Sequence, residues 1–151
     1  MIDVYVWMPK HIANQKNIGH TSLLINQQTY ISWWPEQHGL KNVHPIRNRN
    51  YFSDVIGERC NPDWNLQLNG LDEEAILEWW KGFGLVSGNT ILQGPLPPYN
   101  FIKQNCSTVV AIGLKKGGGD EYANSHRSRH IIWTPWAVLH YALSIQKGLT
   151  K

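Results

Sequence analysis

The sequence is poor in cysteine and has no long apolar run. Its 151 residues include two cysteines, Cys60 and Cys106. Two are too few for a disulfide scaffold, so we expect free thiols, with a single bridge between them as the alternative. The first residues carry Asp3 and no apolar stretch of signal length, and no later stretch approaches a membrane span. These absences exclude a disulfide-rich scaffold and a helical membrane protein, and they predict a soluble chain without a signal peptide of its own.

The sequence also has no large excess of positive or negative charge. The net charge is +3, and the Lys and Arg residues are scattered rather than clustered. This balance gives only weak support for an anionic membrane as partner, and we expect no nucleic-acid partner. Aromatic residues, in contrast, are abundant, with eight Trp and six Tyr. We therefore expect a core rich in large rings, some of them at the rim of a groove.

The order of the predicted elements indicates a single α+β domain over residues 1–151 with an antiparallel sheet. Strands are expected early and helices mostly late. The polar stretch 11–17 and the region after the glycines at 117–119 are predicted to be loops, and residues 37–65 a long surface excursion. The expected strands are 4–8, the hairpin 20–25 and 30–34, a short one at 54–56, and 130–133; the expected helices follow Asp72, Asn105 and Thr134.

The stretch QNCSTVVAIGLKKGGG joins a reactive atom to the start of a helix. If Asn105 caps this helix and Gly117 ends it, Cys106 begins an apolar face that includes Gly113, whose lack of a side chain permits close packing. Unpaired N–H groups and the helix dipole favour negative charge there, so the Cys106 thiol should ionise more readily than a free one. We predict that Cys106 is a nucleophile; a buried structural thiol is the alternative. Cys60 lacks such a setting and is predicted to be structural.

A thiolate needs a base, and histidine suits that role near neutral pH. His20 has the best setting of the seven histidines, because it opens a strand and small residues follow it, so its ring could face a cleft. The alternative is a strand-start histidine that bonds a backbone carbonyl. His126 and His130 are four residues apart, but two imidazoles form an incomplete metal site. We therefore expect no metal and no cofactor.

Four blocks of the sequence resemble a known group of enzymes: GHTSLLI, YISWWP, NCSTVVAIGLKKGGG and TPWAVLHYA. A histidine strand that precedes an Asn-Cys helix resembles the circularly permuted papain-like group, which includes NlpC/P60-related hydrolases and lecithin:retinol acyltransferase-like enzymes. The blocks also resemble domains of bacterial polymorphic toxins and secreted effectors. The resemblance implies that the cysteine helix packs on the histidine strand, that a third polar residue orients the imidazole, and that the chain is secreted or delivered within a larger effector.

The resemblance leaves the remaining site residues open. Ser32 and Glu36 are the polar candidates for orienting His20, and a carboxylate would also stabilise the imidazolium. Gln104 is the nearest side chain that could join the Cys106 N–H in an oxyanion hole. Trp33 and Trp34 are expected to form core on one face and a substrate groove on the other.

The predicted activity is that of a cysteine-dependent hydrolase or acyltransferase that works through a thioester. The implied substrates are amides in peptidoglycan or protein, with lipid esters second, and the implied partner is a cognate immunity protein. Two alternatives stay open. One is a lipid-directed thiol acyl hydrolase with the same Cys-His pair, and the other is an inert binding domain with a Trp-rich groove.

Overall fold

The computed structural model describes residues 1–34, 50–83, 86–87, 90–91 and 105–151. Within these residues the chain is an α+β structure built on a four-stranded antiparallel sheet of order β5-β4-β1-β6. No helix of the described part is both long and apolar enough to cross a bilayer. The sheet strands are β1 (Ile2–Trp7), β4 (His20–Ile25), β5 (Thr29–Ile31) and β6 (Trp64–Leu68); the small hairpins are β2 (Lys10–Ile12) with β3 (Gln15–Asn17) and β7 (Val86–Ser87) with β8 (Thr90–Ile91).

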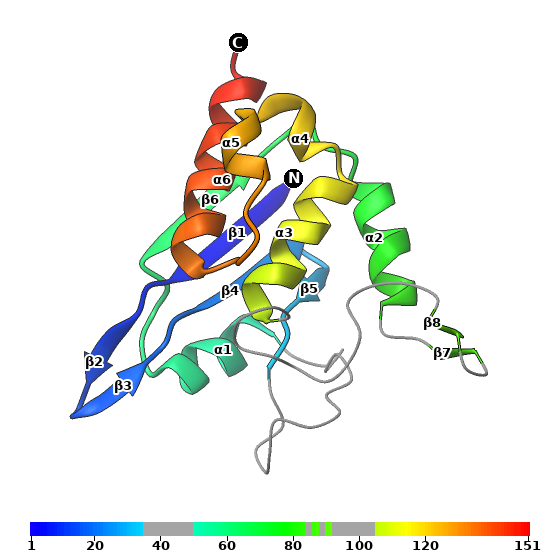
Figure 1. Cartoon of the computed structure of the whole chain (residues 1–151). Helices are drawn as coiled ribbons and strands as arrows, with labels where there is room; N and C mark the ends of the chain where they lie inside the picture. The colour runs from blue at the N-terminus through cyan, green and yellow to red at the C-terminus, as the bar shows by residue number, and fades with distance from the viewer. Residues whose placement is uncertain (35–49, 84–85, 88–89, 92–104) are drawn as a thin grey trace.

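Helices lie on both faces of the sheet. α3 packs against β4, and α6 packs against β6 and β1, while α1 lies on the opposite side (Figure 1). Alternation along β1 explains this division, because Tyr5 and Trp7 point to the α1 side and contact Tyr51, whereas Val4 and Val6 join the core. The helices are α1 (Tyr51–Glu58), α2 (Glu73–Gly82), α3 (Cys106–Lys116), α4 (Gly119–Tyr122), α5 (Ser125–Ser128) and α6 (Pro135–Leu149).

The core holds α3 close to the histidine strand. Val109, Val110 and Leu114 of α3 are fully buried. A Cβ added at Gly113 would lie 3.1 Å from Leu23 of β4, which is tighter than ordinary contact. The sequence-based expectation of close packing at Gly113 is therefore confirmed, as are the helix caps at Asn105, Asp72 and Thr134, the last with Pro135 in the first turn.

Several sequence-based predictions are wrong. The stretch 11–17 contributes a hairpin rather than a loop, and α4 and α5 occupy much of the loop expected after the glycines. Residues 54–56 lie in α1 rather than in a strand, and β6 was not expected. Residues 130–133 form no strand: Ile131 is 95% exposed, so no sheet buries this β-branched run.

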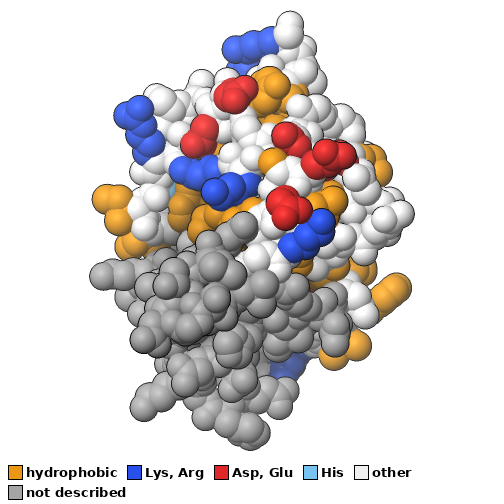
Figure 2. Space-filling view, turned by 90° about the vertical axis from the view of Figure 1, so that its right-hand side faces the viewer, with side chains coloured by type: hydrophobic (Ala, Val, Ile, Leu, Met, Phe, Trp, Pro, Cys, Tyr) orange, Lys and Arg blue, Asp and Glu red, His pale blue; other side chains and the backbone are white. Residues whose placement is uncertain are grey.

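Among the described residues, the side of the molecule that carries α2 shows both positive and negative side chains (Figure 2). Figure 2 shows Lys and Arg side chains intermingled with Asp and Glu on this face. Part of this mixing is an ion pair between Lys81 and Glu78 on α2, in which both side chains are highly exposed. Such a pair contributes little to stability, and the described residues of this face form no patch of one sign that would attract a strongly charged partner.

Candidate active site

Cys106 is the first residue of α3 and is 5% exposed. Asn105 caps the helix, because its side-chain oxygen accepts the Thr108 N–H at 3.0 Å. The same side chain donates to the Trp133 carbonyl oxygen at 3.0 Å and so fixes the helix start to the segment that precedes α6. Ser107 accepts a hydrogen bond from Thr21 of β4 at 3.3 Å. The cysteine is thus held at a rigid helix terminus, where backbone N–H groups have no intrahelical acceptor.

His20 opens β4 and lies opposite Trp7 in the sheet register. Its ring is packed between Trp7 and Trp34, with centroid distances of 5.6 and 4.7 Å. The prediction that this ring faces an open cleft is wrong, because the side chain is only 3% exposed. β5 ends at Ile31, three positions before Trp34, the residue that would face His20 if the register continued.

Asp54 of α1 is a site residue that the sequence reasoning missed. It is fully buried, and its Oδ2 atom accepts hydrogen bonds from His20 Nε2 at 3.0 Å, from Ser32 at 2.7 Å and from the Tyr30 hydroxyl at 2.9 Å. Its Oδ1 atom accepts the Trp34 Nε1–H at 2.7 Å. Four donors around one buried carboxyl group favour its ionised form. Asp54 therefore holds a proton on Nε2 of His20 and fixes the orientation of the ring.

The protonation of His20 depends on two neighbours. Burial lowers the pKa of His20, but its interactions with the Cys106 thiolate and with the Asp54 carboxylate outweigh burial and raise the pKa to about 10. An interaction that favours the imidazolium beside a thiolate favours the thiolate by the same amount. The three side chains, drawn from α3, β4 and α1, can therefore hold a charged Cys-His pair next to a carboxylate.

The outcome for the other predicted site residues is mixed. Ser32 does lie against the imidazole, with its hydroxyl 2.9 Å from Nε2. Trp34 is partly buried and forms a wall beside His20, whereas Trp33 is 1% exposed and packs edge-on against Phe83 in the core. Trp33 is thus no groove residue, which corrects the expectation. Glu36 and Gln104 lie outside the described residues.

A pocket of about 320 Å³ opens at the sulfur. Its walls are mostly apolar and come from the loop before β4 and from the start of α6, rather than from the predicted tryptophan pair. His20, although it interacts with Cys106, is not among the residues that line this pocket. The lining residues are Pro9, Ile18, Gly19, Asn105, Cys106, Ser107, Trp133, Thr134 and Pro135.

Gly19 lets the chain turn tightly at the pocket. Its φ is +85°, and an added Cβ would lie 2.5 Å from the Trp7 carbonyl oxygen. We expect Gly19→Ala to lower the free energy of unfolding by about 2–3 kcal/mol, measured by urea denaturation. Gly118→Ala is the control, because Gly118 has a similar φ of +83° but an added Cβ there would make only ordinary contact, 3.7 Å from the Glu121 side chain. Equal losses for the two variants would show that the contact with Trp7 adds nothing.

Cys60 differs from Cys106. Both thiols are free, which agrees with the sequence-based expectation and rules out the alternative of one bridge in this structure. Cys60 is partly exposed, follows α1 and accepts the Trp7 Nε1–H through its carbonyl oxygen. In the described ranges no three His, Cys, Asp or Glu side chains gather as metal ligands.

Comparisons with known proteins support a bacterial effector origin. The family model described as IcsB middle domain matches residues 59–151, which include Cys106 but not His20 or Asp54. The chain is also similar to a multifunctional-autoprocessing repeats-in-toxin protein of Vibrio vulnificus, with 28% identity over 86 residues. This match covers 56% of the chain and 2% of the toxin, so the chain spans a small fraction of that relative's length. No solved structure matches significantly.

Proposed function

The chain belongs to the IcsB middle domain family, and from this premise we propose that it is a bacterial effector domain that transfers acyl groups through a thioester on Cys106. The observation that carries the proposal is the buried His20 ring, bonded through Nε2 to Asp54 and interacting with Cys106. An activated thiol nucleophile consists of a cysteine, a histidine that interacts with it, and a carboxylate that orients the histidine. The histidine strand precedes the cysteine helix, as in the permuted papain-like group.

The proposed reaction has two steps. In the first, the Cys106 thiolate attacks a carbonyl carbon, N–H groups of the first turn of α3 stabilise the oxyanion, and His20 gives its proton to the leaving group. This forms a thioester and releases an alcohol, thiol or amine. In the second, His20 takes a proton from water or from an acceptor nucleophile, which attacks the thioester and releases Cys106 as the thiolate.

The pocket favours an apolar acyl group. Its walls include Ile18, Trp133 and Pro135, and its mostly apolar surface would gain free energy by burying hydrocarbon. A peptidoglycan stem carries many polar groups, which such walls would leave without hydrogen bonds. We therefore favour a lipid-derived acyl donor over the peptidoglycan amide that the sequence resemblance placed first.

Trapping the acyl-enzyme tests the proposal. After incubation with p-nitrophenyl octanoate, intact mass and peptide mapping should find one octanoyl group on Cys106. Cys106→Ala should slow nitrophenol release by about 10³-fold or more. Cys60→Ala is the matched control and should retain the parent rate. The octanoyl ester should also react faster than the acetyl ester, because only the longer chain fills the apolar pocket.

The same experiment distinguishes the binding-domain alternative. A binding domain with an inert Cys106 would give no adduct, or slow adducts on Cys60 and Cys106 alike. Either result would reject the thioester mechanism. A preference for the acetyl over the octanoyl ester would leave the nucleophile in place but reject the apolar acyl group.

A further inference from the structure

Exposed apolar side chains lie next to the pocket. We name Ile18, Ile131, Ile132 and Trp136 the apolar rim. Ile18 itself lines the pocket, while the other three flank the lining segment 133–135 in the chain. All four are exposed, between 47% for Ile132 and 95% for Ile131. Isolated exposed apolar residues are common, but several beside one pocket mark a surface that meets an apolar partner.

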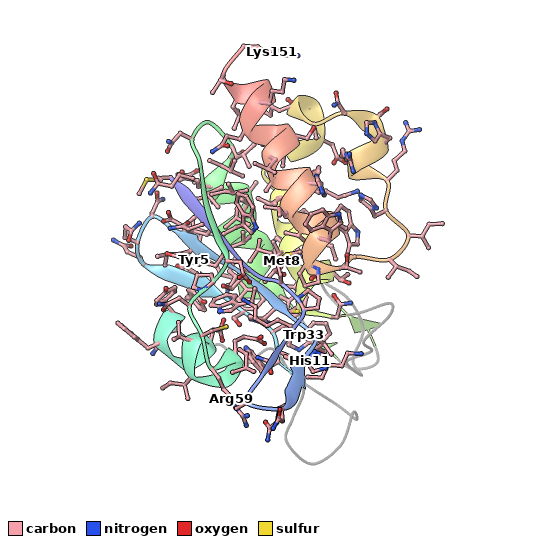
Figure 3. All side chains as sticks on the ribbon, turned by 90° about the vertical axis from the view of Figure 1, so that its left-hand side faces the viewer. Tyr5, Met8, His11, Trp33, Arg59 and Lys151 are labelled. Atoms are coloured by element: carbon pink, nitrogen blue, oxygen red, sulfur yellow. The ribbon has the colours of Figure 1, made fainter. Side chains whose placement is uncertain are left out.

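The rim is held in place rather than left loose. Lys115 of α3 donates to the Ser128 carbonyl oxygen at 2.6 Å, and its ammonium group lies 5.6 Å from the centroid of the Trp133 ring. These two contacts anchor the connection between α5 and α6 on either side of Ile131 and Ile132. Figure 3 shows side chains of this connection projecting away from the body of the molecule. The fold therefore leaves both isoleucine side chains in contact with water. This exposure is unfavourable, and contacts within the described chain do not offset it.

The segments that carry the rim contain no acidic residue. Residues 4–35, which include Ile18, and residues 122–151, which include the rest of the rim, lack Asp and Glu entirely. Arg127 and Arg129 lie within four residues of Ile131, and Lys16 lies two residues before Ile18. Although the net charge is only +3 and α2 lies on a face of mixed charge, the rim segments are locally cationic. Cations beside exposed isoleucine and tryptophan match the headgroup region of an anionic bilayer.

We propose that the apolar rim docks the protein on an anionic lipid bilayer, with the mouth of the pocket turned toward the lipid. Ile131, Ile132 and Trp136 enter the interfacial layer, and Arg127 and Arg129 contact lipid phosphates. Docking requires no covalent step, so it does not depend on the proposed acyl transfer. Where both hold, the pocket would receive its acyl donor directly from the bilayer.

Vesicle sedimentation with the full chain tests the docking. The parent should bind vesicles of phosphatidylcholine with about 30% phosphatidylserine, bind pure phosphatidylcholine more weakly, and lose binding as salt increases. The double variant Ile131→Asn with Ile132→Asn should lower the partition coefficient by about tenfold or more. Ile56→Asn is the matched control, because Ile56 is 76% exposed on α1 and does not line the pocket. Cys106→Ala should bind as the parent does.

Three outcomes would overturn the proposal. The first is a parent that does not sediment with anionic vesicles, which would assign the rim to a protein interface instead. The second is an equal loss for Ile56→Asn and for the double variant, since binding would then be unspecific. The third is equal binding to neutral and anionic vesicles. Failure of thioester formation, in contrast, would leave all these partition coefficients unchanged.

Discussion

Asp54→Asn should lower the rate of acyl transfer by about 10³- to 10⁴-fold while leaving the chain folded. The reason is the number of donors that one carboxylate serves: His20, Tyr30, Ser32 and Trp34 all donate to it. An amide offers a single acceptor oxygen and carries no negative charge. The imidazolium of His20 therefore loses its buried counter-charge, and the charged pair with Cys106 becomes less favourable.

The amide also brings a donor into a site built of donors. If its oxygen takes the place of Oδ2, its NH₂ group faces the Trp34 Nε1–H, so one hydrogen bond is lost. We expect this to lower the free energy of unfolding by about 1–3 kcal/mol, which urea denaturation would measure. Burial, followed by the nearby Asp54 charge, raises the pKa of Tyr30, so its hydroxyl keeps the proton that it donates to Asp54.

The control for Asp54 is another carboxylate that accepts a tyrosine hydroxyl, at a more exposed place in the fold. Asp120 of α4 accepts the Tyr141 hydroxyl much as Asp54 accepts that of Tyr30. Asp120→Asn should cost stability but leave the acyl-transfer rate within a few-fold of the parent. Histidine ring NMR separates the two roles further: only Asp54→Asn should lower the pH at which His20 loses its proton. Equal rates in the two variants would show that Asp54 acts only through folding.

The helix that carries Asp54 explains why sequence reasoning missed it. α1 buries Asp54 and Glu58 and exposes Phe52 and Ile56, at 74% and 76%. This is the reverse of an ordinary amphipathic helix, so a search for apolar residues at helical spacing assigns the wrong face or none. The cap at Asn50 uses Ser53 rather than the usual Glu or Gln, which weakens that signal too. A polar site buried under a helix inverts the pattern on which prediction depends.

The cysteine helix was predictable because every local signal agreed. Asn105 caps α3, Gly117 ends it, and the apolar residues between them face the sheet, so propensity, capping and periodicity all gave the same answer. His20 was likewise found from its place at the start of β4. The apolar pocket was not foreseen, because it joins the turn at Gly19 to the segment before α6, and such non-local contacts leave no periodic trace. Chemistry could be predicted on elements whose local signals agreed, such as α3 and β4, whereas the polar site under α1 and the surfaces between elements could not.

Alkylation of Cys106 by iodoacetamide should be nearly independent of pH between about pH 6 and 8, while alkylation of Cys60 rises about tenfold per pH unit. Burial, with Asp63 and Glu58 nearby, raises the pKa of the Cys60 thiol. The Cys60 thiolate fraction is therefore small throughout this range and grows with each unit of pH. His20, whose pKa is raised to about 10, keeps its proton across the same range and stabilises a thiolate at Cys106. At the acid end Cys106 should thus react at least ~100-fold faster than Cys60.

His20→Gln separates the charged pair from mere exposure. Glutamine can still bond to Asp54 but carries no positive charge, so the alkylation rate of Cys106 should become as steeply pH-dependent as that of Cys60. Peptide mapping after brief labelling gives both rates from one sample, and each thiol serves as the reference for the other. Parallel slopes for the two cysteines in the parent would mean that Cys106 is a neutral thiol. A buried neutral thiol beside a protonated His20 would contradict the electrostatics from which the mechanism follows, because the imidazolium would then lack the thiolate that helps to keep it charged.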